Sequence, residues 1–268
     1  MARIERNPDF LDRIERFRLL DDTFMSVVFD DKECAEFLIR KILDDQSLSV
    51  VSVTAQKEMK NLNGRSIRLD IHAIDSNGKA YDIEVERSDS RATPKRARYN
   101  ASIMDSYITE PGDDYEKLPE SYVIFVTEND VWKGNLPIYT ADRCIKELGN
   151  ASFGDESHIL FVNTAYKGES RLDSLFHDFR CTDPDNMKNE ILADRVRYFK
   201  ESDEGVDSMC QIMEELRDKS FAQGEARGAK KEKKQLIMQL LKNMSISEVA
   251  KNLNMSVEDV EKIVNSED

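Results

Sequence analysis

Two segments and the turn between them decide the fold: Arg68-Leu-Asp-Ile-His-Ala-Ile-Asp-Ser-Asn-Gly-Lys-Ala-Tyr-Asp-Ile-Glu-Val-Glu86. Side chains alternate between the two faces of a strand, so Asp82, Glu84 and Glu86 share one face and the apolar residues between them share the other. Gly78 supplies the left-handed conformation that a three-residue loop requires. The stretch therefore predicts a β-hairpin with one carboxylate face, formed by residues 66–74 and 79–87.

The loop at residues 76–78 also fixes the register of this hairpin. It places Asp70 opposite Glu84 and Arg68 opposite Glu86, with opposed side chains on the same face. Directly opposed carboxylates repel each other. A bound cation would remove the repulsion, because Mg²⁺ is held by one or two carboxylates together with waters and phosphate oxygens. Such a cation fits phosphodiester hydrolysis.

The acidic face of the hairpin could alternatively have a structural role only. Half-exposed hairpins often carry one polar face in water, and Arg68 and Lys79 would then balance the acidic charge. His72 lies beside the acidic pair in the sequence pattern. A single histidine on such a strand is expected to be structural.

The rest of the chain predicts an α/β core followed by helices. Helical patterns occur at residues 10–20, 31–43, 93–108, 172–179, 185–199 and 206–217, and strand patterns at 48–54, 122–127, 136–140 and 158–163. Thr93 and Pro94 are typical of a helix start. The unbroken apolar run at 122–127 predicts a strand buried on both faces.

We expect four parts: a helical lead-in at 1–20, a core at 21–167, a helical extension at 168–224, and a basic helix with a helix-turn-helix-like tail at 225–268. Ser245 with Glu248, and Ser256 with Asp259, form two capping-box patterns in the tail. The second tail helix is acidic, so phosphate should repel it. We expect the C-terminal region to serve packing or a homodimer, and the lysine-rich run before it to be a solvated linker or, alternatively, a DNA contact.

Composition limits the class of protein. The net charge is −14, which opposes a protein that coats nucleic acid. The four cysteines form no C-x-x-C pair, and the longest apolar runs are too short to span a bilayer. We expect a cytoplasmic protein without a membrane partner.

Several motifs resemble the Rpn family of PD-(D/E)XK nuclease family transposases, in the same order and at matching spacings. They are Phe24-Met25 with Val28-Phe29, Gly64-Arg-Ser-Ile-Arg-Leu-Asp70, the Gly78 turn, Tyr81-Asp-Ile-Glu-Val-Glu86 and Lys95-Arg-Ala-Arg-Tyr99. The likeness continues through Pro137-Ile-Tyr139. It implies an α/β fold with a restriction-endonuclease-like core, a mixed sheet flanked by helices, and here an all-helical C-terminal extension.

The resemblance also implies roles for individual residues. Asp70 and Glu84 correspond to the metal-binding acids, and the implied cofactor is Mg²⁺, with Mn²⁺ as an alternative. The third motif position is commonly Gln in the family and Lys in the wider superfamily, but here it is Glu86. Glu86 is then either a third ligand or general base, or the mark of a weakened site.

Two further roles follow from the resemblance. An acid from the helix at 31–43 often completes such sites, and Glu33 and Glu36 are the candidates. The helix after the hairpin has a polar face near the site, which makes Arg96 a candidate phosphate contact. A solvated helix surface is the alternative for all three.

The predicted function is an Mg²⁺-dependent DNA endonuclease that acts in recombination or transposition, with DNA as its partner and Asp70, Glu84 and Glu86 as catalytic residues. The alternative is a catalytically weakened or inactive relative that binds DNA or protein. Glu86 and the net charge favour the alternative, whereas Asp70 and Glu84 favour the nuclease. Fold alone decides neither, because sites carry function.

Overall fold

A computed structural model describes residues 6–60, 66–88 and 90–265 of the protein. Gly64 and Arg65, which begin one of the motifs quoted above, lie outside them. The chain forms two compact units, Met1–Val206 and Asp207–Asp268. The boundary expected at residue 167 does not separate them, because the helices that follow pack onto the first unit.

A six-stranded mixed sheet forms the centre of the first unit, with strand order β1-β2-β3-β4-β8-β5. Its strands are β1 (Val50–Met59), β2 (Ile67–Asp75), β3 (Ala80–Glu86), β4 (Ser121–Thr127), β5 (Ile138–Ala141) and β8 (Ser157–Asn163). β3, β4 and β8 run parallel, and the other neighbours are antiparallel. The central position of β4 confirms that the run at 122–127 is a strand buried on both faces. A short second sheet of β6 (Cys144–Ile145) and β7 (Ala151–Ser152) had no clear sequence signal.

The hairpin of β2 and β3 has the predicted register over four residue pairs, from Ile74–Ala80 to Ile71–Ile83. Gly78 has a φ of 84°, as the loop requires. The extension of this ladder to the pairs Asp70–Glu84 and Arg68–Glu86 is wrong, because the paired part ends at Ile71 and Ile83. The two strands separate beyond that point.

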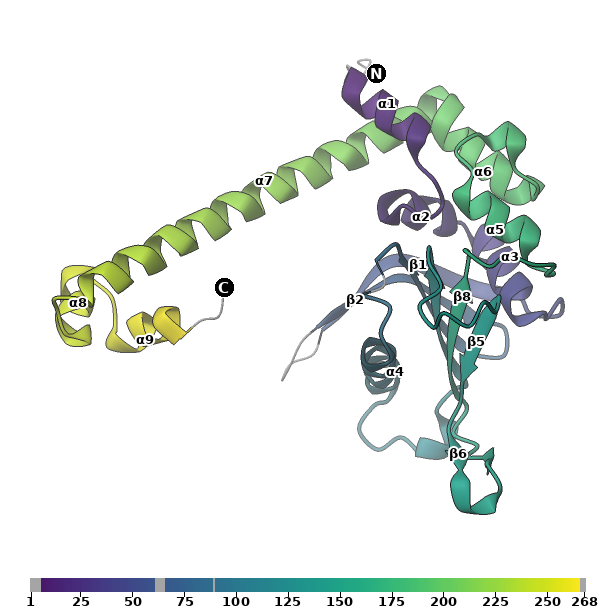
Figure 1. Ribbon diagram of the computed structural model, residues 1–268, viewed down its shortest axis with the longest axis horizontal. Helices are drawn as coiled ribbons and strands as arrows, with labels where there is room; N and C mark the ends of the chain where they lie inside the picture. Colours follow the sequence, from purple (N-terminus) through teal and green to yellow (C-terminus); the bar gives the residue numbers. More distant parts are fainter. Residues whose placement is uncertain (1–5, 61–65, 89, 266–268) are drawn as a thin grey trace. The chain divides into compact units, whose positions relative to one another are not determined.

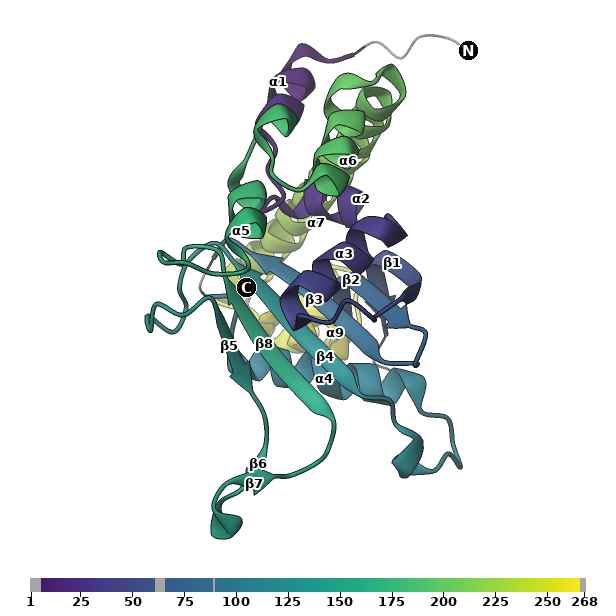
Figure 2. The ribbon, with the colours of Figure 1, turned by 90° about the vertical axis from the view of Figure 1, so that its right-hand side faces the viewer.

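Helices cover both faces of the sheet (Figures 1 and 2). α2 (Asp22–Phe29) and α3 (Lys32–Leu43) pack on one face and α4 (Pro94–Ile108) on the other, and α6 (Glu190–Glu201) packs on α2 and α3. The other helices of this unit are α1 (Pro8–Arg16) and α5 (Asp173–Arg180). Figure 2 shows α3 in front of the sheet and α4 behind it. On the α4 face, Ala97, Ala101 and Met104 pack with Leu69 and Phe125 in one apolar cluster. The small alanine side chains let α4 lie close to β3 and β4. The polar residues of α4 are therefore near enough to contact side chains of these strands.

Asp178 on α5 connects this helix by hydrogen bonds to the residues just before α6. Its carboxylate is fully buried and accepts hydrogen bonds from the backbone N–H groups of Lys188 (2.7 Å) and Asn189 (2.9 Å), and from the Asn189 side chain (2.7 Å). Lys200 on α6 donates to the backbone carbonyls of Glu15 (2.9 Å) and Phe17 (2.7 Å) at the C-terminal end of α1. These bonds tie α5 and α6 to the core.

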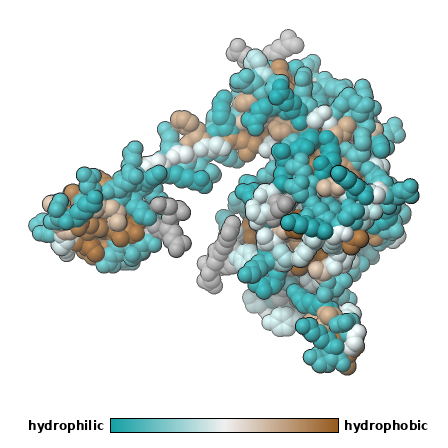
Figure 3. All heavy atoms as spheres, viewed as in Figure 1, coloured by the Kyte–Doolittle hydropathy of each residue, from teal (hydrophilic) through white to brown (hydrophobic). Residues whose placement is uncertain are grey.

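The second unit is helical. It contains most of α7 (Asp203–Leu240), with α8 (Ile246–Asn252) and α9 (Val257–Asn265). The predicted capping box at Ser245 and Glu248 is present, and Ile237, Val249, Ala250 and Val260 form a small core. Apolar side chains gather around this end of α7, in brown in Figure 3. Within the described part of the chain, no helix is both long and apolar enough to cross a membrane.

Candidate active site

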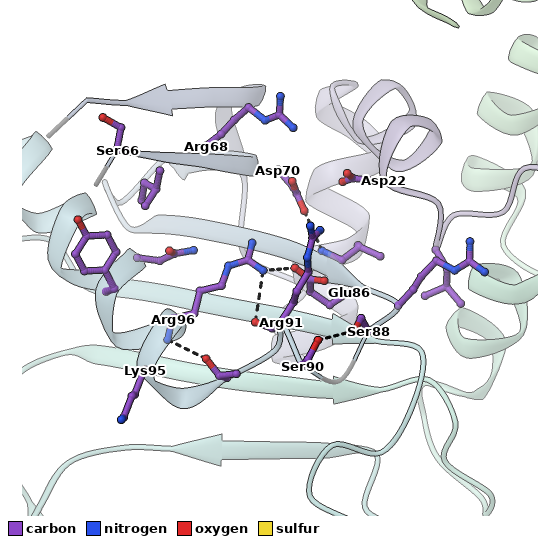
Figure 4. Close-up of a pocket in the computed structure, with 17 residues that line it drawn as sticks. Asp22, Ser66, Arg68, Asp70, Glu86, Ser88, Ser90, Arg91, Lys95 and Arg96 are labelled. Atoms are coloured by element: carbon purple, nitrogen blue, oxygen red, sulfur yellow. Dashed lines mark hydrogen bonds and ion pairs between the residues drawn. The ribbon is translucent and has the colours of Figure 1, made fainter. Parts of the chain in front are cut away.

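A pocket of about 910 Å³ opens where β2 and β3 separate. Its acidic lining consists of Asp22, Asp70 and Glu86, and its basic lining of Arg68, Arg87, Arg91, Lys95 and Arg96. Hydroxyl groups of Ser66, Ser88, Ser90, Thr93 and Tyr99 lie among them. Asp70 and Glu86 are buried and form an acidic floor, whereas the exposed charged residues of the rim are mostly basic, with Asp22 as the acidic exception (Figure 4).

Asp70 lies at an irregular point of β2. Gln56, its neighbour on β1, has a φ of 53°, and the β1–β2 pairing skips both residues. The Asp70 carboxylate then accepts a hydrogen bond from the backbone N–H of Val85 on β3 (3.3 Å). The Asp70 side chain thus accepts a backbone N–H just beyond the last residue pair of β2 and β3. This hydrogen bond holds the Asp70 carboxylate between the two strands.

The carboxylate face of β3 is buried, so its interpretation as a solvated polar face is wrong. Asp82 and Glu84 are fully buried, and Glu86 is 6% exposed. Asn100 on α4 donates to Asp82 Oδ2 (3.0 Å) and to Glu84 Oε1 (3.2 Å). Arg96, one helical turn earlier, forms ion pairs with both Glu84 and Glu86.

Burial and mutual repulsion raise the pKa values of these acids. Desolvation, followed by the nearby charges of Glu84 and Asp22, raises the pKa of Asp70 to about 8. Desolvation and the charge of Asp82 raise the pKa of Glu84, and desolvation also raises that of Asp82. The Arg96 guanidinium acts against all three shifts. One arginine does not neutralise so many buried carboxylates, and a site of this charge favours a further cation.

Arg96 is held firmly by its surroundings. Burial lowers its pKa, but Glu84 and Glu86 raise it by more. Its guanidinium carbon lies 5.4 Å from the centre of the Phe125 ring, and Thr93 accepts its backbone N–H at the start of α4 (3.2 Å). This confirms Thr93 as the N-cap of the helix.

The structure brings Asp70, Glu84, Glu86 and Arg96 together, but it places Glu33 and Glu36 elsewhere. Glu36 pairs with Arg40 (2.8 Å) and accepts the backbone N–H of Val50 (2.8 Å). Glu33 is exposed, and neither residue lines the pocket. The expectation for both is corrected: the acid that lines the pocket from the helices before β1 is Asp22, the first residue of α2.

Sequence reasoning missed Asp22 and Asn100 as parts of the site. Asn100 stands four residues after Arg96, which is a spacing that places both on one helix face, so this signal was available. Asp22 carries no comparable signal. His72 lies opposite Asp82 in the ladder, and burial lowers its pKa to about 4, so it is neutral at pH 7.

A divalent metal requires oxygen ligands that converge on one point. Among the residues described, no three His, Cys, Asp or Glu side chains are already arranged to hold a metal ion. Asp70 lines the pocket, and the buried Glu84 lies close enough for its charge to act on Asp70. The two carboxylates are hard oxygen ligands, and Mg²⁺ commonly takes one or two carboxylates and completes its shell with waters and phosphate oxygens. The residues present therefore fit such an ion.

A mixed sheet flanked by helices, with acids on two separating strands, defines a protein of the PD-(D/E)XK class. The model of the family described as PD-(D/E)XK nuclease family transposase matches residues 30–175. The chain belongs to that family. Nucleases of this class use divalent metals and act on DNA. No curated protein and no solved structure matches the chain.

Proposed function

We propose that the protein is a metal-dependent DNA endonuclease, with Mg²⁺ or Mn²⁺ held by Asp70 and Glu84. The observation that carries this proposal is the placement of Asp70 in a pocket with a basic rim, with the buried carboxylate of Glu84 next to it. Such a site has more carboxylates than cations on its floor, where Arg96 is the one cation paired with carboxylates of β3 among the described residues, and it has free cations where a phosphate backbone would lie. When bound, the metal would activate water and stabilise the leaving oxygen.

Three rim cations support DNA as the substrate. Arg68, Arg91 and Lys95 are exposed, and none forms an ion pair with another described residue. In contrast, Arg87 on the same rim pairs with Asp21 (2.7 Å) and Glu128 (3.1 Å). Free cations on the rim can neutralise phosphates. They answer the objection from the net charge of −14, because the local charge at the pocket differs from that of the whole chain.

The reaction consumes one water for each bond cleaved. The water oxygen forms a bond to phosphorus, the bond from phosphorus to the leaving sugar oxygen breaks, the water loses a proton, and the leaving oxygen gains one. The rim cations would bind the phosphates on either side. Asp22, which raises the pKa of Asp70, would add negative charge near the same cation.

Cleavage of supercoiled plasmid DNA tests the proposal. The wild-type protein should nick or linearise the plasmid with Mg²⁺ or Mn²⁺ and not with EDTA, whereas Asp70→Ala and Glu84→Ala should be inactive. Glu33→Ala, which lies outside the pocket, should retain activity. Equal cleavage by all four proteins would contradict the assignment, and an inactive wild type would favour a binding role for the fold.

A further inference from the structure

Arg96 stands where the chemistry of the pocket needs a positive charge. Its two terminal nitrogens contact Glu84 and Glu86 separately, so one guanidinium bridges the second and third motif positions. The side chain is 33% exposed and lines the pocket. The group is therefore both held by the protein and open to a ligand (Figure 4).

The third motif position makes this placement informative. A Lys at that position would place a cation beside the scissile phosphate, but the residue here is Glu86, which adds a negative charge. Phosphoryl transfer is catalysed largely by positive groups that stabilise charge on the phosphoryl oxygens. Arg96 supplies a cation at the same place from a different element, the first turn of α4.

Other basic residues of the pocket do not have this position. Arg87 is occupied by Asp21 and Glu128, and Arg68, Arg91 and Lys95 are exposed on the rim. Among the described cations of the pocket, Arg96 alone forms ion pairs with carboxylates of β3. Its planar guanidinium can keep one carboxylate contact and turn other N–H groups to a phosphate.

We propose that Arg96 is a catalytic residue that replaces the cation of the third motif position, and that Glu86 holds Arg96 instead of binding metal or accepting a proton. This inference rests on the proposed nuclease function. Arg96 donates hydrogen bonds to the phosphoryl oxygens as they gain charge and transfers no proton, because arginine stays protonated. The bonds formed and broken are those of the hydrolysis described above.

The test moves the cation from the helix to the strand. It compares the wild type with Arg96→Gln, with the double variant Glu86→Lys/Arg96→Gln, and with Arg98→Gln as a control that removes the same charge from an exposed position on α4. Plasmid cleavage, Mn²⁺ affinity by calorimetry and thermal unfolding are measured for each protein. The double variant keeps a cation beside Glu84, which guards against loss of the fold.

We expect Arg96→Gln to lose about 100-fold in cleavage rate, the usual cost of removing one group that stabilises a transition state. Its Mn²⁺ affinity should be retained, since Arg96 competes with metal for Glu84. Glu86→Lys/Arg96→Gln should regain at least about tenfold of the lost rate, though less than all of it, because Lys lacks the planar fork. Arg98→Gln should match the wild type.

Three outcomes would overturn the inference: wild-type cleavage by Arg96→Gln, loss of Mn²⁺ binding in that variant, or a folded double variant that is no faster than Arg96→Gln. Each leaves wild-type cleavage intact, and so leaves the proposed nuclease function standing. An inactive wild type would instead overturn the nuclease function, and this inference with it.

Discussion

The carboxylate of Asp70 accepts the backbone N–H of Val85 across 3.3 Å, just beyond the last backbone pair of β2 and β3. A side chain that replaces a ladder bond lets the strands separate without leaving that donor unpaired. The separation opens the pocket and places Asp70 near Glu84. The geometry of the site thus depends on an irregularity in the sheet.

The stability of the metal-free protein should fall as pH rises toward 8. Asp70 has a raised pKa in the folded state, about 8 instead of 3.8. Its contribution to stability is therefore full below pH 3.8 and is lost as pH rises through 8, with a slope of at most about 1.4 kcal/mol per pH unit. Thermal unfolding between pH 6.5 and 8.5 should show this fall in the wild type, and a smaller one in Asp70→Asn. Mn²⁺ should reduce the fall in the wild type alone, and parallel curves for both proteins would contradict the assignment.

Asn100 should be required for the stability of the acidic site. Asn100→Ala removes the donor that Asp82 and Glu84 share, and an unsatisfied buried acceptor costs about 1–3 kcal/mol. Urea unfolding should show a loss of about 2 kcal/mol or more. Ser102→Ala, an exposed change on the same helix, should cost little; equal losses in the two variants would show that the shared amide contributes nothing.

Asp178 should hold α5 and α6 together. Asp178→Ala leaves two backbone N–H groups and one side-chain amide without their acceptor in a buried position. We expect a loss of about 2–4 kcal/mol in the free energy of unfolding. Asp194→Ala on the exposed surface of α6 is the matched control, and a loss no larger than that of the control would be the contrary result.

The rim cations should contribute to DNA binding through salt-dependent contacts. Replacing Arg68, Arg91 and Lys95 by Gln should make the slope of log affinity against log salt shallower by about 3, because each phosphate contact contributes about 0.9. Binding would be measured by fluorescence anisotropy without divalent metal. A control triple variant at the exposed Lys117, Lys133 and Lys146 loses the same charge, and an equal change in its slope would show only an effect of net charge.

Much of the fold could be predicted from the sequence, because the decisive signals were local. Gly78 and the alternation around Glu84 defined the hairpin and its register, and Thr93 with Pro94 defined the start of α4. The separation of β2 and β3 at Asp70 could not be predicted, and neither could the left-handed conformation of Gln56 beside it on β1, because no local pattern marks either one. The alternation of apolar and polar residues predicts a regular pair of strands, but it does not predict where the pairing ends.

The site was predictable to a similar extent. The motif acids and Arg96 lie together, as the resemblance implied, because they belong to one hairpin and the helix after it. The choice of Glu33 and Glu36 was wrong because the orientation of α3 depends on packing far along the chain: Cys34 contacts the carbonyl of Ile191 on α6 (3.8 Å). A contact between residues so far apart in the sequence leaves no local sequence signal. Asp22 was missed because its place in the site likewise depends on packing between distant segments.

Mn²⁺ binding measured by titration calorimetry tests the central claim most directly. If Asp70 and Glu84 hold the metal, the wild type binds Mn²⁺, Asp70→Asn and Glu84→Gln bind at least about tenfold more weakly, and Glu33→Gln binds like the wild type. Equal Mn²⁺ affinities in all four proteins, or no binding by the folded wild type, would contradict the claim.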